Sequence, residues 1–401
     1  MPGDHPSREK LQDLAGFPSF PAPKGLKTRP IIAFPVIDPR VSRLARLVTD
    51  YSVSVKEGDE VIIRAEVEAL PLVRELVRLV VSKGAYPHIM LGDSQLDEIF
   101  YRYASDSVLR HLSPIEKFIQ ERIDVSISIV SSSHTKPLVG VDPERIRVRR
   151  AARAELTEIF MRRQAAGELR WNVTIYPTNA LAQEAGMGPV EYEDFIFSAC
   201  MVDRDDPIKE WRRKAEEQEK IVNLLSKIDE LRVVSEDTDL LIKVGGRKWL
   251  NDDGRHNMPA GEVFTAPIED GVEGRVTFSF PAVGGGFEVE GVRLEFKRGV
   301  VVNASAEKGA DKLKKILETD EGSKRLGEVA FGLNYNITRP TKQILLDEKI
   351  GGTMHMALGA AYPDTGGTNK SSIHWDLILD LRRGRVYGNN ELIYENGRFL
   401  A

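Results

Sequence analysis

His374 and Asp376 lie two residues apart near the end of this 401-residue chain, at the start of an apolar run. Ile373 and Leu377–Leu379 indicate a buried or half-buried strand, in which residues i and i+2 point to the same face. The imidazole and the carboxylate therefore emerge side by side. Because burying either group unpaired is costly, a bound metal ion would satisfy both. A hydrogen bond that only orients a core imidazole is the simpler alternative, since buried polar groups normally pair.

Four further residues in the C-terminal half favour the metal. His355 follows two glycines that let backbone approach a ligand, and Tyr362 lies seven residues further on. Glu262 opens an apolar segment, and Glu328 is bordered by glycine and apolar residues. Each acid alone could cap a helix or form half of an ion pair, but carboxylates in such settings need partners. Together these residues form a chemically consistent ligand set.

The number of candidate ligands predicts the kind of metal site. Five residues carry suitable groups: Glu262, Glu328, His355, His374 and Asp376. A catalytic mononuclear zinc needs three protein ligands and water, so five are too many for one open site. If one carboxylate bridges two ions, the five residues supply three bonds to each ion. This arrangement suits two-metal hydrolysis, in which the ions activate water and polarise a carbonyl. Nitrogen and oxygen ligands fit zinc, which we expect, and also cobalt or manganese.

Five separated blocks carry a resemblance to a known family: residues 261–267, 325–330, 355–359, 362–363 and 372–376. They resemble the M29 metallo-aminopeptidases, also called the aminopeptidase T or thermophilic metalloprotease family, and the resemblance runs from about Ser42 to the C-terminus. It implies that Glu262, Glu328, His355, Tyr362, His374 and Asp376 surround two divalent metal ions. It also implies an aminopeptidase that hydrolyses peptides with a free N-terminus, and a homodimer.

Two residues are expected to take part in the reaction itself. We expect Glu328 to bridge the ions or to act as the general base, and Tyr362 to ligate weakly or to donate to the oxyanion. The segment 346–354, before His355, differs from the Asp-Glu-Asn-Ala-type run of the bacterial form of the family and looks more like an archaeal branch. This difference leaves the ligands intact and the preferred N-terminal residue open.

Two other functions have to be weighed. Ser94, in Gly92-Asp93-Ser94, is similar to the nucleophile block of G-D-S-type serine esterases. Those enzymes need an Asp-x-x-His pair near the C-terminus, whereas His374 precedes Asp376 here, so a helix cap at Asp93 or Ser94 is the better interpretation. A non-catalytic peptide-binding protein with structural metals is the other alternative.

Composition excludes some partners and indicates a compartment. A net charge of −5 gives no reason to expect nucleic acid or an anionic membrane. The apolar stretch Leu70–Val81 is interrupted by charged residues, so no segment is expected to span a bilayer. The single cysteine, Cys200, excludes an intrachain disulfide and is consistent with a cytoplasmic protein, as is an N-terminus without a signal-peptide layout.

The elements that position these residues predict two domains. Residues 1–40 are expected to be a proline-rich arm. In residues 41–244 strand-like and helix-like segments alternate, which predicts an open parallel α/β sheet with right-handed crossovers, including one helix over 143–164. Residues 245–401 are β-rich with glycine turns, which predicts a mixed α+β domain that binds the metals. Hairpins are expected around 284–286 and 388–390.

Overall fold

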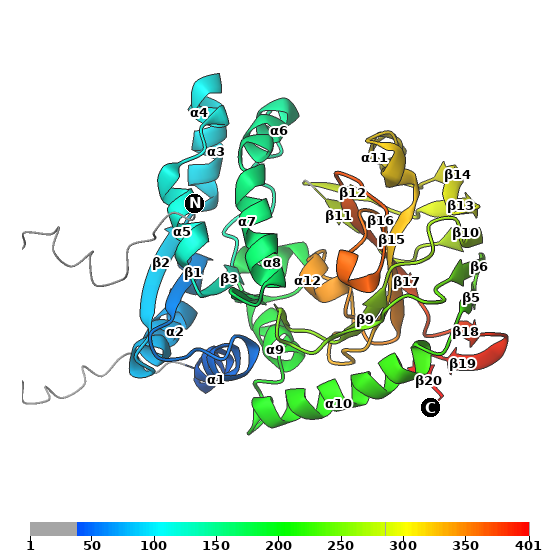
Figure 1. The fold of residues 1–401 in the computed structure, drawn as a ribbon, viewed down its shortest axis with the longest axis horizontal. Coiled ribbons are helices and arrows are strands. Elements are labelled where there is room, and N and C mark those ends of the chain that lie inside the picture. Colours follow the sequence, from blue (N-terminus) through cyan, green and yellow to red (C-terminus); the bar gives the residue numbers. More distant parts are fainter. Residues whose placement is uncertain (1–37, 285, 401) are drawn as a thin grey trace, which may run out of the picture. The chain divides into compact units, whose positions relative to one another are not determined.

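A parallel sheet organises the first half of the chain. The computed structural model describes residues 38–284 and 286–400, so the predicted arm lies outside the described residues up to position 37. The strand order is β2-β1-β3-β4-β8, and every neighbouring pair is parallel (Figure 1). The strands are β1 (Glu60–Glu66), β2 (Tyr86–Gly92), β3 (Val125–Val130), β4 (Arg170–Ile175) and β8 (Asn257–Met258). The short β8 comes from beyond the predicted domain boundary at residue 244.

Helices cover both faces of this sheet. Val61, Ile62 and Ile63 are consecutive in β1 and all buried, which a strand allows only when both faces are covered. Ile62 packs near Ile119 and Phe160 of two different helices. The helices of this half are α1 (Pro39–Leu47), α2 (Leu70–Ser82), α3 (Ser94–Tyr103), α4 (Asp106–Arg110), α5 (Pro114–Arg122), α6 (Pro143–Ala152), α7 (Ala154–Ala165), α8 (Asn179–Glu184), α9 (Pro189–Ala199) and α10 (Pro207–Leu225), with short turns η2 (Val48–Ser52) and η3 (Val67–Ala69).

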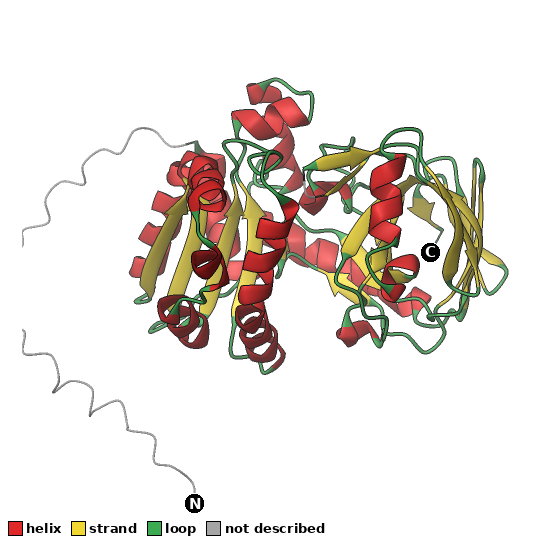
Figure 2. Ribbon diagram, turned by 90° about the horizontal axis from the view of Figure 1, so that it is seen from above, coloured by secondary structure: helices red, strands yellow, loops and turns green. Residues whose placement is uncertain are grey.

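The second half is built from antiparallel sheets (Figure 2). An eight-stranded sheet has the order β14-β13-β10-β6-β5-β18-β19-β20, a five-stranded sheet has the order β17-β16-β15-β9-β7, and β11 pairs with β12. The strands are β5 (Glu230–Ser235), β6 (Thr238–Lys243), β7 (Leu250–Asp252), β9 (Glu262–Thr265), β10 (Val272–Thr277), β11 (Ala282–Gly284), β12 (Phe287–Val289), β13 (Arg293–Lys297), β14 (Val300–Ser305), β15 (Leu326–Gly332), β16 (Thr353–Gly359), β17 (His374–Asp380), β18 (Arg385–Gly388), β19 (Glu391–Glu395) and β20 (Arg398–Phe399). The helical segments are α11 (Ala310–Leu317), η4 (Glu321–Lys324), α12 (Ile344–Asp347) and η5 (Pro363–Thr365).

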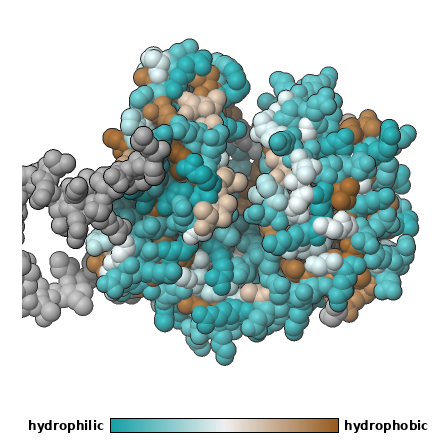
Figure 3. All heavy atoms as spheres, viewed as in Figure 1, coloured by the Kyte–Doolittle hydropathy of each residue, from teal (hydrophilic) through white to brown (hydrophobic). Residues whose placement is uncertain are grey.

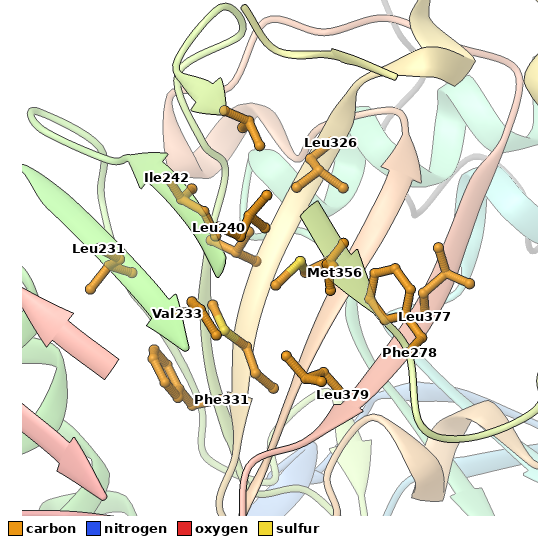
Figure 4. Close-up of a cluster of buried hydrophobic side chains, with 14 of the residues drawn as sticks. Leu231, Val233, Leu240, Ile242, Phe278, Leu326, Phe331, Met356, Leu377 and Leu379 are labelled. Carbon is orange, nitrogen blue, oxygen red and sulfur yellow. The ribbon is translucent and has the colours of Figure 1, made fainter. Parts of the chain in front are cut away.

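A large hydrophobic core lies between these two sheets. Val233 and Leu240 of the eight-stranded sheet belong to one buried cluster with Phe331, Met356 and Leu377 of the five-stranded sheet (Figure 4). Burying apolar side chains from both sheets stabilises the fold by about 25 cal/mol for each Å² removed from water. The core therefore fixes one face of β15, β16 and β17 and leaves the opposite face for other uses.

The predicted fold class is confirmed: a parallel α/β sheet is followed by an antiparallel, β-rich half. The single helix predicted over 143–164 is wrong in one respect, because the chain breaks at Arg153 into α6 and α7. The antiparallel pairs β11–β12 and β18–β19 confirm the two predicted hairpins. In the described residues, no helix is both long and apolar enough to span a membrane.

Candidate metal centre and active site

Strand alternation places the candidate ligands on the face opposite the core. In β16, Met354 and Met356 belong to the core cluster, so His355 between them points to the other face. In β17, Leu377 is in the core, and His374 and Asp376 therefore share the outer face. The predicted side-by-side arrangement of this pair follows directly from the strand.

A bulge in β15 brings Glu328 to the same face. Leu326 is in the core, and a regular strand would send Glu328 there too, but the pairing with β16 shifts between the two residues. Gly327 allows this shift, because a Cβ at that position would lie 2.3 Å from the carbonyl oxygen of Ala360. A side chain at residue 327 is thus incompatible with the geometry that directs Glu328 into the site.

Small residues leave space between the ligands. Glu328 and Asp376 both pair with Ala357, one from each side, so the two carboxylates flank a methyl group. His355 pairs with Ala330 of β15. Glu262, the first residue of β9, completes the set from the far side of β15. The outer face of this sheet therefore carries small side chains with acidic and imidazole groups around them.

The five ligand candidates lie close together, with Glu328 in the centre. Its Oε1 is 3.3 Å from Nε2 of His355, and its Oε2 is 3.2 Å from Nε2 of His374. Nε2 of His355 is also 3.6 Å from Oε2 of Glu262, and Nε2 of His374 is 3.5 Å from Oδ1 of Asp376. Two groups of three residues share Glu328, and within each group the possible ligand atoms lie within 4.8 Å of one another.

Backbone carbonyls fix which nitrogen of each imidazole is available. Nδ1 of His355 donates to the carbonyl oxygen of Glu348 at 3.0 Å, and Nδ1 of His374 donates to that of Ala360 at 2.8 Å. A carbonyl only accepts, so each Nδ1 carries a hydrogen and each Nε2 can offer its lone pair. Such a partner for the second nitrogen is the usual support of a metal-ligating histidine.

The electrostatics of the cluster favour bound cations. Burial opposes ionisation of Glu328, but hydrogen bonds from His355 and His374 outweigh it and lower the pKa of Glu328 to about 2. Burial likewise opposes the charged imidazoles, yet the carboxylates raise the pKa of His355 to about 10 and that of His374 to about 11. Carboxylates that keep protons on the neighbouring imidazoles this firmly would also hold divalent cations, which displace those protons on binding.

Two carboxylate oxygens support the same interpretation. Oε2 of Glu262 and Oδ1 of Asp376 are buried and have no hydrogen-bond partner among the described residues. Orphaned carboxylate oxygens are costly, and both of these face an imidazole Nε2. The donor set of carboxylate oxygens and imidazole nitrogens fits divalent metal ions such as zinc, cobalt or manganese.

Tyr362, the sixth predicted residue, lies beside the cluster. It directly precedes η5, and its ring centroid is 5.1 Å from that of His374 and 5.7 Å from that of Phe264. The residue is 44 % exposed, so the ring forms part of the site's outer wall. Burial of the hydroxyl and the negative charge of Glu328 raise the pKa of Tyr362 above its usual value, so the phenol keeps its proton.

The sequence reasoning missed two charged neighbours of the site, Glu348 and Lys349, and expected a turn at Asp252 that could lie near it. Glu348 has a carboxylate oxygen close to ligand atoms of His355 and Asp376. Lys349 is fully buried and forms ion pairs with Glu262, Glu348 and Asp252. Three consecutive charged residues, 347–349, resemble a solvated turn. Only their place between the apolar residues 344–346 and His355 would have signalled burial.

A cavity opens next to the candidate metal ligands. Its volume is about 360 Å³, and His374, Trp375 and Asp376 form one side of it. Residues of the first half, including Lys136 and Glu184, form the opposite side. A pocket of this size can accept a few amino-acid residues of a peptide chain.

Ser94 has none of the partners that a serine nucleophile needs. Its hydroxyl donates to Glu66 at 2.8 Å, and Ser133 donates to Ser94 and to Glu66. In the described part of the chain, no histidine is hydrogen-bonded to Ser94. Asp93 caps α3 by accepting from the backbone N–H of Gln95, as the helix-cap interpretation predicted.

Comparison with known proteins identifies the family. The thermophilic metalloprotease (M29) family matches residues 37–399. Aminopeptidase 2 of Geobacillus stearothermophilus is 28 % identical over 90 % of this chain and 97 % of its own length. Aminopeptidase T of Thermus aquaticus is 30 % identical over 84 % and 92 %. The solved structure of wild-type AmpT from Thermus thermophilus is 27 % identical, with a TM-score of 0.79 over 90 % of this chain and 99 % of that chain.

The chain therefore belongs to the M29 family of thermophilic metalloproteases, as the five sequence blocks predicted. Within that family it is a metallo-aminopeptidase, which confirms the predicted enzyme class.

Proposed function

We propose that this enzyme removes N-terminal residues from peptides with two divalent metal ions. Glu262, Glu328 and His355 hold one ion, and Glu328, His374 and Asp376 hold the other. The observation that carries this proposal is the placement of Glu328, whose two carboxylate oxygens face two different imidazoles. A site for one ion would need only one of these groups.

Each residue then has a defined task. When bound, the two ions activate a water molecule and polarise the scissile carbonyl. Glu328, whose two oxygens face the two imidazoles, would hold both ions and would then be unable to act as the general base. Glu348, partly exposed and close to His355 and Asp376, accepts the proton from water. Tyr362 keeps its proton and donates a hydrogen bond to the oxyanion.

Substrates are peptides with a free α-amino group. The cavity beside His374 is lined by Asp376, whose carboxylate attracts a positively charged N-terminus, whereas Glu184 and Glu288 there already pair with Lys136 and Lys342. An N-acetylated peptide lacks this charge, so it is a poor substrate. The metals are zinc in the first instance, with cobalt or manganese as alternatives, because the ligands are nitrogen and oxygen without thiolate.

We further propose a cytoplasmic homodimer, with functional domains at residues 41–244 and 245–401. Apolar side chains are exposed on α3 and α5, among them Leu96, Tyr103 and Phe118. Figure 3 shows a mainly hydrophilic face with apolar groups in the region of α3 and α4. A second copy would cover such groups. Cys200, the single cysteine, is buried and suits a reducing compartment.

Metal analysis of the purified protein combined with hydrolysis of a panel of aminoacyl reporter amides tests the function. We expect two ions per chain and release of the reporter from unblocked amino acids. His374→Ala is the informative variant, and His88→Ala is its control, because His88 also pairs with a carboxylate (2.5 Å to Glu60) but lies on β2. Activity that survives chelation, with fluorophosphonate labelling of Ser94, would instead support the serine esterase. A protein that binds two ions but hydrolyses no amide would support the non-catalytic peptide-binding alternative.

A further inference from the structure

Lys349 is a buried cation inside the metal site. Its side chain has 0 % exposure, and lysine is almost never fully buried unless it is paired. Its Nζ lies 3.3 Å from Oε1 of Glu262 and 3.7 Å from Oδ2 of Asp252, and it also contacts Glu348. The ammonium therefore lies among three carboxylates, one of which is a proposed metal ligand.

The surrounding strands hold these carboxylates in place. Asp252 of β7 pairs directly with Glu262 of β9. Gln218 of α10 donates to the backbone carbonyl oxygens of both residues, at 3.0 and 3.2 Å. The two acids cannot separate without breaking this connection. When both acids are ionised they need a cation between them, since uncompensated buried charges are strongly destabilising.

The position of the ammonium also gives the two carboxylate oxygens of Glu262 different partners. Oε1 faces Lys349, whereas Oε2 faces Nε2 of His355 at 3.6 Å and has no hydrogen-bond partner among the described residues. Only Oε2 is therefore free to bind a metal. Oδ2 of Asp252, which also has no hydrogen-bond partner there, faces Lys349 at 3.7 Å.

From this geometry we propose that Lys349 is a built-in cation of the metal site. It takes the place that a further metal ion would otherwise take between Asp252, Glu262 and Glu348. It is a positioning residue, because it holds Glu262 as a one-oxygen ligand and keeps Asp252 out of the metal shell. The proposal rests on the metal site described under the proposed function.

Metal content tests this role without relying on activity. Lys349→Met keeps the length of the side chain and removes its charge, which leaves three neighbouring carboxylates without a cation. After equilibration with zinc, and separately with manganese, we expect this variant to bind about one more ion per chain than the wild type, because the buried acids again need a counter-charge. Mass spectrometry of the metals, with competition by a chromophoric chelator, measures the number and affinity of the ions.

Two variants serve as controls. Lys349→Met combined with Asp252→Asn restores the charge balance, and we expect it to return to the wild-type number of ions. Lys214→Met makes the same change at a half-buried lysine, whose Nζ donates to the carbonyl oxygen of Leu333 at 2.7 Å and forms no ion pair with a proposed ligand among the described residues. We expect it to lower stability and to leave the metal content unchanged.

The outcomes separate the possible roles. A folded Lys349→Met protein with the wild-type number of ions, or fewer, overturns the proposal. A Lys349→Met chain that becomes soluble only when zinc or manganese is supplied supports it. A chain that stays insoluble at every metal concentration, while the double variant is soluble, overturns it. A wild-type protein that binds no metal refutes the proposed function itself. Two ions in both the wild type and Lys349→Met refute only the role proposed for Lys349.

Discussion

Glu328→Gln is the substitution that tests the shared ligand most directly. Glutamine has nearly the same volume, but its amide is uncharged and offers one oxygen. It therefore removes a ligand from one of the two positions that Oε1 and Oε2 of Glu328 face, and the negative charge from both. A four-ligand structural zinc site is worth about 10–16 kcal/mol, which is about 3–4 kcal/mol for each ligand. Loss of one ligand therefore weakens a position by roughly 100- to 1,000-fold. Glu328→Gln should weaken both positions, whereas His374→Ala and Glu262→Gln should each weaken one.

The assay compares metal content at a fixed free metal concentration. Dialysis against a zinc buffer held about tenfold above the wild-type dissociation constant keeps the wild type nearly saturated and removes an ion from any position weakened 100-fold. We expect no ions in Glu328→Gln, one in His374→Ala and one in Glu262→Gln, with no turnover in the first two. His88→Ala should keep both ions. If His374→Ala lost both ions as completely as Glu328→Gln, the argument for two positions that share Glu328 would be wrong.

Five other outcomes follow from the same structure. Tyr362→Phe should keep its fold and both metals but lose about a hundredfold in kcat, as is typical when an oxyanion donor is removed; unchanged turnover would exclude that role. Glu348→Gln should keep its metals and lose kcat with little change in KM, which steady-state kinetics measures. Gly327→Ala should lower Tm and metal content together, because the new Cβ would lie 2.3 Å from the Ala360 carbonyl oxygen. Peptides with N-terminal leucine should be cleaved one residue at a time and N-acetylated peptides should not be cleaved, which chromatography of the products measures. Light scattering should give the mass of a dimer for the wild type and that of a monomer for Phe118→Glu.

The orientation of the site residues that lie on β16 and β17 was predictable, because the alternation of side chains along a strand depends only on local sequence. The period of two in a strand places His374 and Asp376 on one face, whatever lies around them. The same rule applies to His355 between two core methionines. The helix break at Arg153 was not predictable in this way, because α6 and α7 are both helical by composition and their separation depends on packing.

The remaining part of the site depends on contacts between distant segments. Glu348 and Lys349 belong to a short charged run that would be expected in water, yet Lys349 is fully buried because the chain brings it to Asp252 and Glu262. No sequence pattern within ten residues of Lys349 indicates that it pairs with Asp252 and Glu262. The orientation of Glu328 likewise depends on a bulge, which residue types alone do not specify.

The charges of the whole cluster give an independent argument for the number of ions. The carboxylates of five residues, Asp252, Glu262, Glu328, Glu348 and Asp376, gather around two imidazoles and one ammonium. With neutral imidazoles and a charged Lys349, four negative charges remain. Two divalent ions neutralise them fully, whereas one divalent ion leaves two negative charges in a largely buried cluster, which is costly. Without metal, protons on both imidazoles and on Asp252 and Glu262, whose pKa values burial raises, neutralise the cluster instead. Replacing Lys349 with methionine raises the deficit to five, so the same count that supports two ions in the wild type predicts the uptake of a further cation by the variant.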